Sequence, residues 1–90
     1  MLIALIARDR PGALQTRLDT RAAHLAYIAE TGVVVQAGPL LDAEGQMCGS
    51  LVILEVADRA AAEAWAGNDP YARAGLFREV ELIEWKKVIG

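Results

Sequence analysis

The sequence predicts an α+β protein with a ferredoxin-like βαββαβ fold, in which a four-stranded antiparallel sheet carries two helices on one face. The first observation is the order of the elements, because short β-branched runs alternate with two segments of helical period. The second is that proline and glycine stand between most of these runs. The third is an apolar content of 54% in only 90 residues, which predicts a partner surface.

The first half of the chain is predicted to be a strand followed by a long helix. Leu2–Arg8 is a short apolar run, and the turn residues Asp9-Arg10-Pro11-Gly12 end it. Helical spacing then runs through Ala13–Thr31, and Gly32 provides a stop. The apolar residues of this helix recur on one stripe, which is expected to face the core: Leu14, Leu18, Leu25 and Ile28.

Two further strands are predicted to form a hairpin. Val33–Leu41 opens with three valines and carries Pro39, which marks a bulge, an edge or the end of the strand. Turn residues occupy Asp42–Gly45, and Gly49–Val56 is the third strand. Both faces of this third strand are largely apolar, so the face away from the helices is expected to be covered. One face comprises Ser50, Val52, Leu54 and Val56, and the other comprises Leu51, Ile53 and Glu55.

The last part of the chain is predicted to be a helix, a helical turn and a strand. Asp58 is a good N-cap for a helix over Asp58–Ala66. Asp69-Pro70 can restart a short helical turn, which Gly75 ends. Leu76–Val88 is predicted to be a strand longer than usual, part of which reaches a partner subunit. The two tryptophans, Trp65 and Trp85, are expected to be packing residues.

The composition and charge of the chain limit the kinds of partner that it can bind. We expect one domain over residues 1–90 that forms a homodimer, the commonest symmetric assembly. The formal charge of −3 and the scattered basic residues argue against nucleic acid. The apolar start of the chain is too short to span a membrane, and it lacks the features of a signal peptide. Cys48, the single cysteine, fits a cytoplasmic setting and a structural role. One histidine and one cysteine predict no metal, and we expect no cofactor.

The only histidine, His24, lies on the first helix with two arginines. Arg17, Arg21 and His24 are at i, i+4 and i+7 and therefore share a basic stripe. This stripe is either a solvated helix face or a cationic pocket wall with a titratable group at one end. Asp69 is either a helix N-cap or a carboxylate that orients a histidine, as the acid of a catalytic triad does. The residues alone leave both pairs of alternatives open.

The sequence also resembles a known family, the YciI-like (YCII-related) proteins, over its full length and in order. Each motif is short, and their order and spacing carry the resemblance: Met1–Ala7, Arg17, Arg21–Leu25, Ala37–Leu40, Gly49-Ser50, Ala64-Trp65, Asp69–Tyr71, Ala74–Leu76 and Lys86–Val88. The resemblance implies a dimeric α/β barrel, as in muconolactone isomerases and small antibiotic-biosynthesis monooxygenases. It also implies that His24 and Asp69 form a catalytic pair in one pocket, which Gly38, Pro39, Ser50 and Tyr71 line.

Two functions are therefore expected as alternatives. The first is a cofactor-independent acid–base enzyme, acting by isomerisation, lactone chemistry or elimination on a small organic acid or aromatic compound. The second is a non-catalytic module that binds a small anionic metabolite in the same pocket. Arg17 and Arg21 are expected to hold an anion in either case, with a preference that weakens as the pH rises through the titration of His24.

Overall fold

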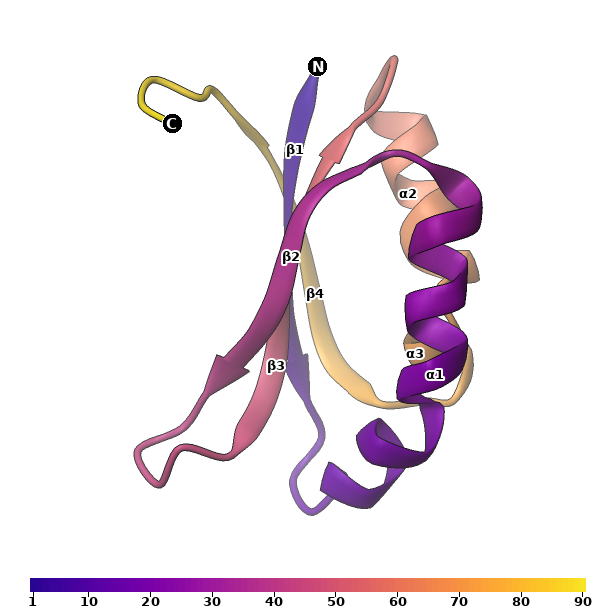
Figure 1. The fold of residues 1–90 in the computed structure, drawn as a ribbon, viewed down its shortest axis with the longest axis vertical. Coiled ribbons are helices and arrows are strands. Elements are labelled where there is room, and N and C mark those ends of the chain that lie inside the picture. The colour runs from indigo at the N-terminus through magenta and orange to yellow at the C-terminus, as the bar shows by residue number, and fades with distance from the viewer.

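The computed structural model describes residues 1–90 and has the predicted order of elements (Figure 1). The strands form one sheet in the order β2-β3-β1-β4, and every neighbouring pair is antiparallel. The helices all lie on one side of this sheet (Figure 1), which confirms the ferredoxin-like arrangement. The elements are β1 (Leu2–Asp9), α1 (Leu14–Thr31), β2 (Val34–Leu41), β3 (Met47–Glu55), α2 (Arg59–Asn68), α3 (Pro70–Arg73) and β4 (Phe77–Trp85).

The core lies between the sheet and the helices. Alternate residues of the two central strands point to this side, because side chains along a strand alternate between its faces. Trp65 and Ala62 of α2 close over them, and the Tyr27 and Ile28 end of α1 packs alongside. The buried cluster consists of Ile3, Leu5, Ala7, Val52, Leu54, Ala62 and Trp65. Trp65 is therefore the packing residue that the sequence predicts.

The predicted apolar stripe of α1 holds for Ile28, which packs against the core, but its orientation is wrong for the leucines in the middle of the helix. Leu18 and Leu25 are 47% and 45% exposed, whereas the buried residues of this helix are Arg17 and His24. The reason is that α2 and the C-terminal end of α1 supply the apolar cover of the core. The first three turns of α1 therefore turn a polar face inward, and this face lies over the site described below.

The last strand is shorter than predicted. β4 ends at Trp85, so Lys86–Val88 lie outside the sheet, and the predicted long strand gives no support to a dimer. The chain continues beyond it as an extended tail on the side away from the helices (Figure 1). Trp85 is 39% exposed in the protomer, so its predicted packing role is not met within one copy. None of the helices is long and apolar enough to cross a membrane.

The face of the sheet away from the helices is apolar, as predicted from the third strand. Residues directly opposite each other in a ladder share a face. On this face Ala4 stands between Ile53 and Ile83, and Ile6 is opposite Leu51. Leu51 and Ile83 are 37% and 47% exposed. The protomer therefore leaves a row of large apolar side chains uncovered.

Candidate active site

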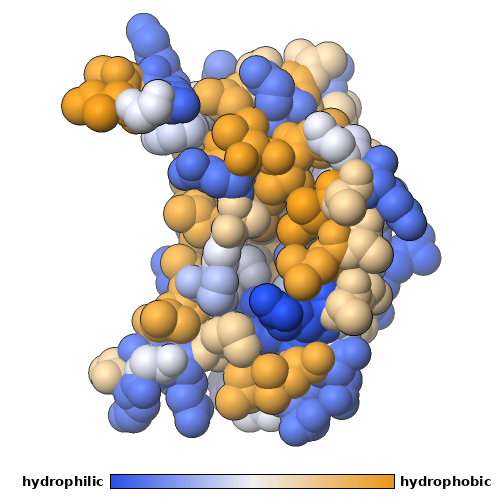
Figure 2. Space-filling model, viewed as in Figure 1, coloured by the Kyte–Doolittle hydropathy of each residue, from blue (hydrophilic) through white to orange (hydrophobic).

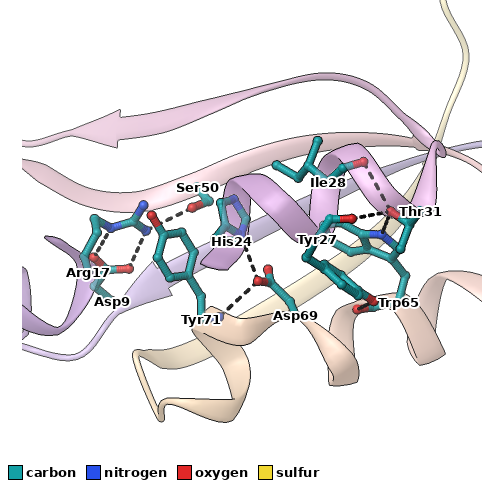
Figure 3. A network of polar contacts seen from close by, with 10 residues as sticks. All are labelled: Asp9, Arg17, His24, Tyr27, Ile28, Thr31, Ser50, Trp65, Asp69 and Tyr71. Atoms are coloured by element: carbon teal, nitrogen blue, oxygen red, sulfur yellow. Dashed lines mark hydrogen bonds and ion pairs between the residues drawn. The ribbon is translucent and has the colours of Figure 1, made fainter. Parts of the chain in front are cut away.

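The histidine and the aspartate singled out in the sequence meet in the structure (Figure 3). Nδ1 of His24 lies 2.8 Å from Oδ1 of Asp69, and both side chains are buried. A carboxylate only accepts, so Nδ1 donates and Nε2 is left without a partner in the protein. The predicted contact between these residues is confirmed.

Local structure explains why Asp69 lies there. It stands at the junction of α2 and α3, and its Oδ1 also accepts the backbone N–H of Tyr71 at 3.0 Å. Pro70 at the first position of α3 is suited to a helix start, because it lacks the N–H that would be unpaired there. Asp69 is therefore both the helix cap and the partner of His24, so the two alternatives hold together.

Tyr71 lies between Arg17 and His24 of α1 (Figure 3). Its ring stacks on the His24 imidazole with centroids 4.0 Å apart and an interplanar angle of 18°. The guanidinium carbon of Arg17 lies 4.7 Å from the same ring centroid. The hydroxyl of Tyr71 interacts with the Arg17 guanidinium, and the residue is only 2% exposed and lines the pocket.

Arg17 is held by a residue that the sequence reasoning missed. Its Nε and Nη2 donate to the two carboxylate oxygens of Asp9, each at 2.8 Å, and Nη2 also donates to Ser50 Oγ at 2.9 Å. Asp9 was interpreted as part of the turn that ends the first strand. Asp19, the acidic residue on the same helix as Arg17, accepts from Gln15 and not from Arg17. The only signal for Asp9 in the sequence was its position as an acidic residue at the end of a strand. This feature is too common in proteins to single out one residue.

The Nε and Nη2 donors of Arg17 are consequently occupied, which limits how Arg17 can hold an anion. Arg17 does not offer two parallel hydrogen bonds to a ligand, because Asp9 uses them. Arg21 is exposed, makes no hydrogen bond in the protein and remains free at the pocket. Loss of hydration lowers the pKa of Arg17, but the hydrogen bond and charge of Asp9 outweigh it, so this pKa is raised overall.

These side chains line a cavity of about 180 Å³ between α1 and the strands β2 and β3. Gly38, Pro39 and Ser50 lie in its wall with His24, Arg17, Arg21 and Tyr71, as the family resemblance implied; Asp69 does not line it and lies behind His24. Apolar residues complete the lining: Leu25, Ile28, Ala37, Met47 and Val52. Figure 2 shows apolar surface along the hollow between α1 and the strands, with a strongly hydrophilic group in its lower part.

A second polar cluster joins the two long helices behind the pair (Figure 3). The Tyr27 hydroxyl donates to the backbone oxygen of Trp65 at 2.8 Å, and Trp65 Nε1 donates to Thr31 Oγ1 at 2.9 Å. Tyr27 is one helical turn from His24, and Trp65 is one turn before Asp69. This cluster fixes α1 against α2 and therefore helps to hold His24 against Asp69.

The fold and the site define a class of protein. The chain has the protomer fold of the dimeric α/β-barrel class, with a buried histidine–aspartate pair beside a small pocket. Solved antibiotic biosynthesis monooxygenases share the fold: one has a TM-score of 0.57 at 17% identity and covers 97% of this chain and all of its own.

Within this class the family is clear. The chain belongs to the family of the YCII-related domain, whose family model matches residues 1–86. Protein YciI of Escherichia coli O6:H1 is 36% identical over 98% of this chain and 99% of its own length. A solved structure of 5-chloro-2-hydroxyhydroquinone dehydrochlorinase (TftG) from Burkholderia phenoliruptrix AC1100, in complex with 2,5-dihydroxybenzoquinone, has a TM-score of 0.89. It is 37% identical and covers 96% of this chain and 94% of its own.

Proposed function

We propose that the protein is a cofactor-independent acid–base enzyme that acts on a small hydroxylated ring compound by proton transfer coupled to elimination or isomerisation. The observation that carries the proposal is the buried contact of His24 Nδ1 with Asp69 Oδ1, which leaves Nε2 free. Every side-chain nitrogen that is fully enclosed in the protein has a hydrogen-bond partner. Nε2 of His24 has none, so it is not enclosed and opens onto the cavity that His24 lines. A histidine oriented in this way is suited to take and return a proton.

The size and lining of the cavity support a ring compound. A cavity of roughly 150 Å³ is enough to hold benzene, so about 180 Å³ suits one substituted six-membered ring. Pro39, Ile28 and Leu25 supply apolar contacts, and Tyr71 and Arg17 supply polar ones. This mixture fits a ligand with an apolar body and oxygen substituents.

An elimination can be completed by a single proton carrier. His24 Nε2 would take a proton from a phenolic oxygen and deliver one to the ring carbon that bears the leaving group. A second phenolic proton is then lost while chloride leaves with the bonding pair, so the ring becomes a quinone as the C–Cl bond becomes C–H. Two O–H protons are consumed, one passing to carbon and one released with chloride. Asp69 would stabilise the imidazolium that forms in between.

The relatives support this class of reaction. The dehydrochlorinase named above acts on a chlorinated hydroxyhydroquinone and was solved with a dihydroxybenzoquinone, and this chain is 37% identical to it. The compounds in its name are single rings of the size that the cavity suits. We therefore include chlorinated and unchlorinated hydroxyhydroquinones among the first substrates to examine.

The test is release of chloride from 5-chloro-2-hydroxyhydroquinone by the wild-type protein and by His24→Gln. The expected result is release by the wild type that falls by about 10²–10⁴-fold in His24→Gln. Arg59→Gln, which removes an exposed arginine on α2 remote from the pocket, is the matched control. Equal rates in His24→Gln and the wild type would exclude His24 as the proton carrier. An inactive wild type with this and other ring substrates would exclude the elimination.

Arg21 favours a second candidate, a non-catalytic module for a small anion. Its guanidinium is exposed at the pocket and makes no contact with an acidic side chain. A binder would take up a carboxylate without turning it over, with an affinity that Arg21→Ala lowers. Calorimetry with small carboxylates, run beside the turnover assay, distinguishes the two functions because only the enzyme consumes its ligand.

We also infer that the protein functions as a homodimer that buries the sheet face away from the helices. Leu51, Ile83 and Trp85 are each more than a third exposed on that face. Exposed rows of this kind are typical of interfaces between subunits. A face-to-face pairing of two such sheets would leave both pockets on the helical sides, where a ligand can enter.

A further inference from the structure

We propose that Arg17 is a preorganised hydrogen-bond donor for an anionic oxygen of the ligand, and that Asp9 is the residue that positions it. The proposal rests on the proposed function, since it assigns the part of the same pocket that His24 does not occupy. It names the substrate class more closely: a compound in which one oxygen carries, or gains during reaction, a single negative charge. Phenolates and enolates are of this class.

The hydrogen bonds of Arg17 leave one nitrogen over. A guanidinium has five N–H donors. Nε and Nη2 are directed to Asp9 and Ser50, whereas Nη1 donates to neither. The Tyr71 hydroxyl also interacts with the guanidinium and helps to raise its pKa. Side-chain nitrogens that are fully enclosed in the protein all have a hydrogen-bond partner. Nη1 is therefore not enclosed, and it opens onto the cavity that Arg17 lines. Arg17 is only 2% exposed, so a ligand in this cavity is the natural acceptor.

The surroundings of Arg17 fix its direction before any ligand arrives. The bidentate contact with Asp9 and the bond to Ser50 hold the planar group from two sides, and the Tyr71 ring lies against it. A donor held in this way needs no reorganisation when charge develops on the acceptor, which is the condition for stabilising a transition state. Arg21 has no such support and is exposed.

The charge balance sets how much negative charge the site accepts. Asp9 neutralises the full charge of Arg17, with both side chains buried. Nη1 therefore offers a strong donor without a net positive charge, which suits a singly charged oxygen better than a dianion. Arg17 and His24 contact the same Tyr71 ring, at 4.7 Å and 4.0 Å from its centroid, so one small ring reaches both groups.

The test compares two ligands that differ in one ionisable oxygen. The probes are 4-nitrophenol, at a pH where it is a phenolate, and 4-nitroanisole, its neutral ether. The wild type is expected to bind the phenolate about tenfold or more tightly than the ether, as a hydrogen bond to a charged group implies. Arg17→Gln is expected to abolish this preference, and Arg59→Gln is expected to keep it. A preference that survives in Arg17→Gln, or that the wild type lacks, overturns the proposal.

A second variant covers the case in which Arg17→Gln fails to fold because Asp9 is left buried and unpaired. Ser50→Ala keeps the Asp9 pair and removes only one restraint on Nη2. It is expected to weaken the preference for the phenolate severalfold at an unchanged melting temperature, which a purely structural role of Arg17 would not do. An unchanged preference in Ser50→Ala overturns the proposal. If Arg17 controls phenolate binding but no substrate is turned over, the enzymatic proposal fails and this inference stands.

Discussion

Asp69 and His24 meet through one carboxylate oxygen that has two tasks. Oδ1 of Asp69 accepts Nδ1 of His24 at 2.8 Å and the backbone N–H of Tyr71 at 3.0 Å. The second contact starts α3 and places the Tyr71 ring against the imidazole. The same atom therefore orients the imidazole and positions the Tyr71 ring beside it, so changes at Asp69 should affect both stability and activity.

The first prediction separates these two tasks of Asp69. Asp69→Asn keeps an oxygen that can cap α3 but loses the negative charge that supports a charged His24. We expect turnover to fall at least tenfold with a smaller loss of stability than in Asp69→Ala. Asp69→Ala loses the cap as well and should cost about 1–3 kcal/mol in free energy of unfolding. Chemical denaturation and turnover measured on both variants check this.

A matched control for Asp69 exists on the neighbouring helix. Asp58 caps α2 by accepting the N–H of Ala61 at 2.8 Å and contacts no histidine. Asp58→Ala should therefore cost about 0.5–2 kcal/mol of stability and leave turnover unchanged. Loss of turnover in Asp58→Ala equal to that in Asp69→Asn would mean that helix capping alone explains the role of Asp69.

The second prediction concerns the homodimer. Ile83→Lys places a charge in the middle of the apolar sheet face, where Ile83 is opposite Ala4. We expect sedimentation to show a dimer for the wild type at micromolar concentration and a monomer for Ile83→Lys. Ala61→Lys, on the exposed side of α2, should remain dimeric. A wild type that sediments as a monomer would contradict the inference.

The third prediction concerns alkaline pH. Burial is the largest cause of the raised pKa of Tyr71, and the charges of Arg17 and Arg21 oppose it. Burial also raises the pKa of Tyr27. A phenol whose pKa is higher in the folded than in the unfolded protein holds its proton more tightly when folded. It therefore stabilises the fold fully below about pH 10, and this contribution is lost as the pH rises through the folded value.

The measurement is the free energy of unfolding between pH 8 and pH 11, in wild type and in Tyr71→Phe. Since phenylalanine does not titrate, Tyr71→Phe should lose less stability than the wild type over this interval. The stacking on His24 is kept in this variant, so it should also remain folded at neutral pH. Parallel curves for the two proteins would show that the Tyr71 hydroxyl does not contribute to alkaline unfolding.

Much of the fold was predictable from local signals. Pro11-Gly12 and Gly32 separate β1, α1 and β2 where the hydrophobic period changes, and these boundaries hold within one or two residues. The orientation of α1 was not predictable in this way. Its leucine stripe indicates a core face, yet the helix buries Arg17 and His24. Polar residues at a site reverse the usual rule, because their desolvation is compensated by partners distant in the sequence.

The site was predictable only in part, for the same reason. His24 stood out as the single histidine, and the resemblance to the family supplied Asp69 as its partner. Asp9 was not found, because its role depends on the end of β1 lying beneath α1, which only the folded chain shows. The end of β4 was also missed: Lys86–Val88 have strand-forming residues nearby but no neighbouring strand to pair with.

The most direct test of the central claim is the electron density of a crystal soaked with 2,5-dihydroxybenzoquinone, a ring of the class proposed for this pocket. We expect the ring in the cavity between α1 and β2, with one oxygen within hydrogen-bond distance of His24 Nε2 and the His24–Asp69 contact intact. A ring bound elsewhere with the cavity empty, or one in the cavity that leaves Nε2 without a ligand contact, would contradict the assignment of His24 as the proton carrier.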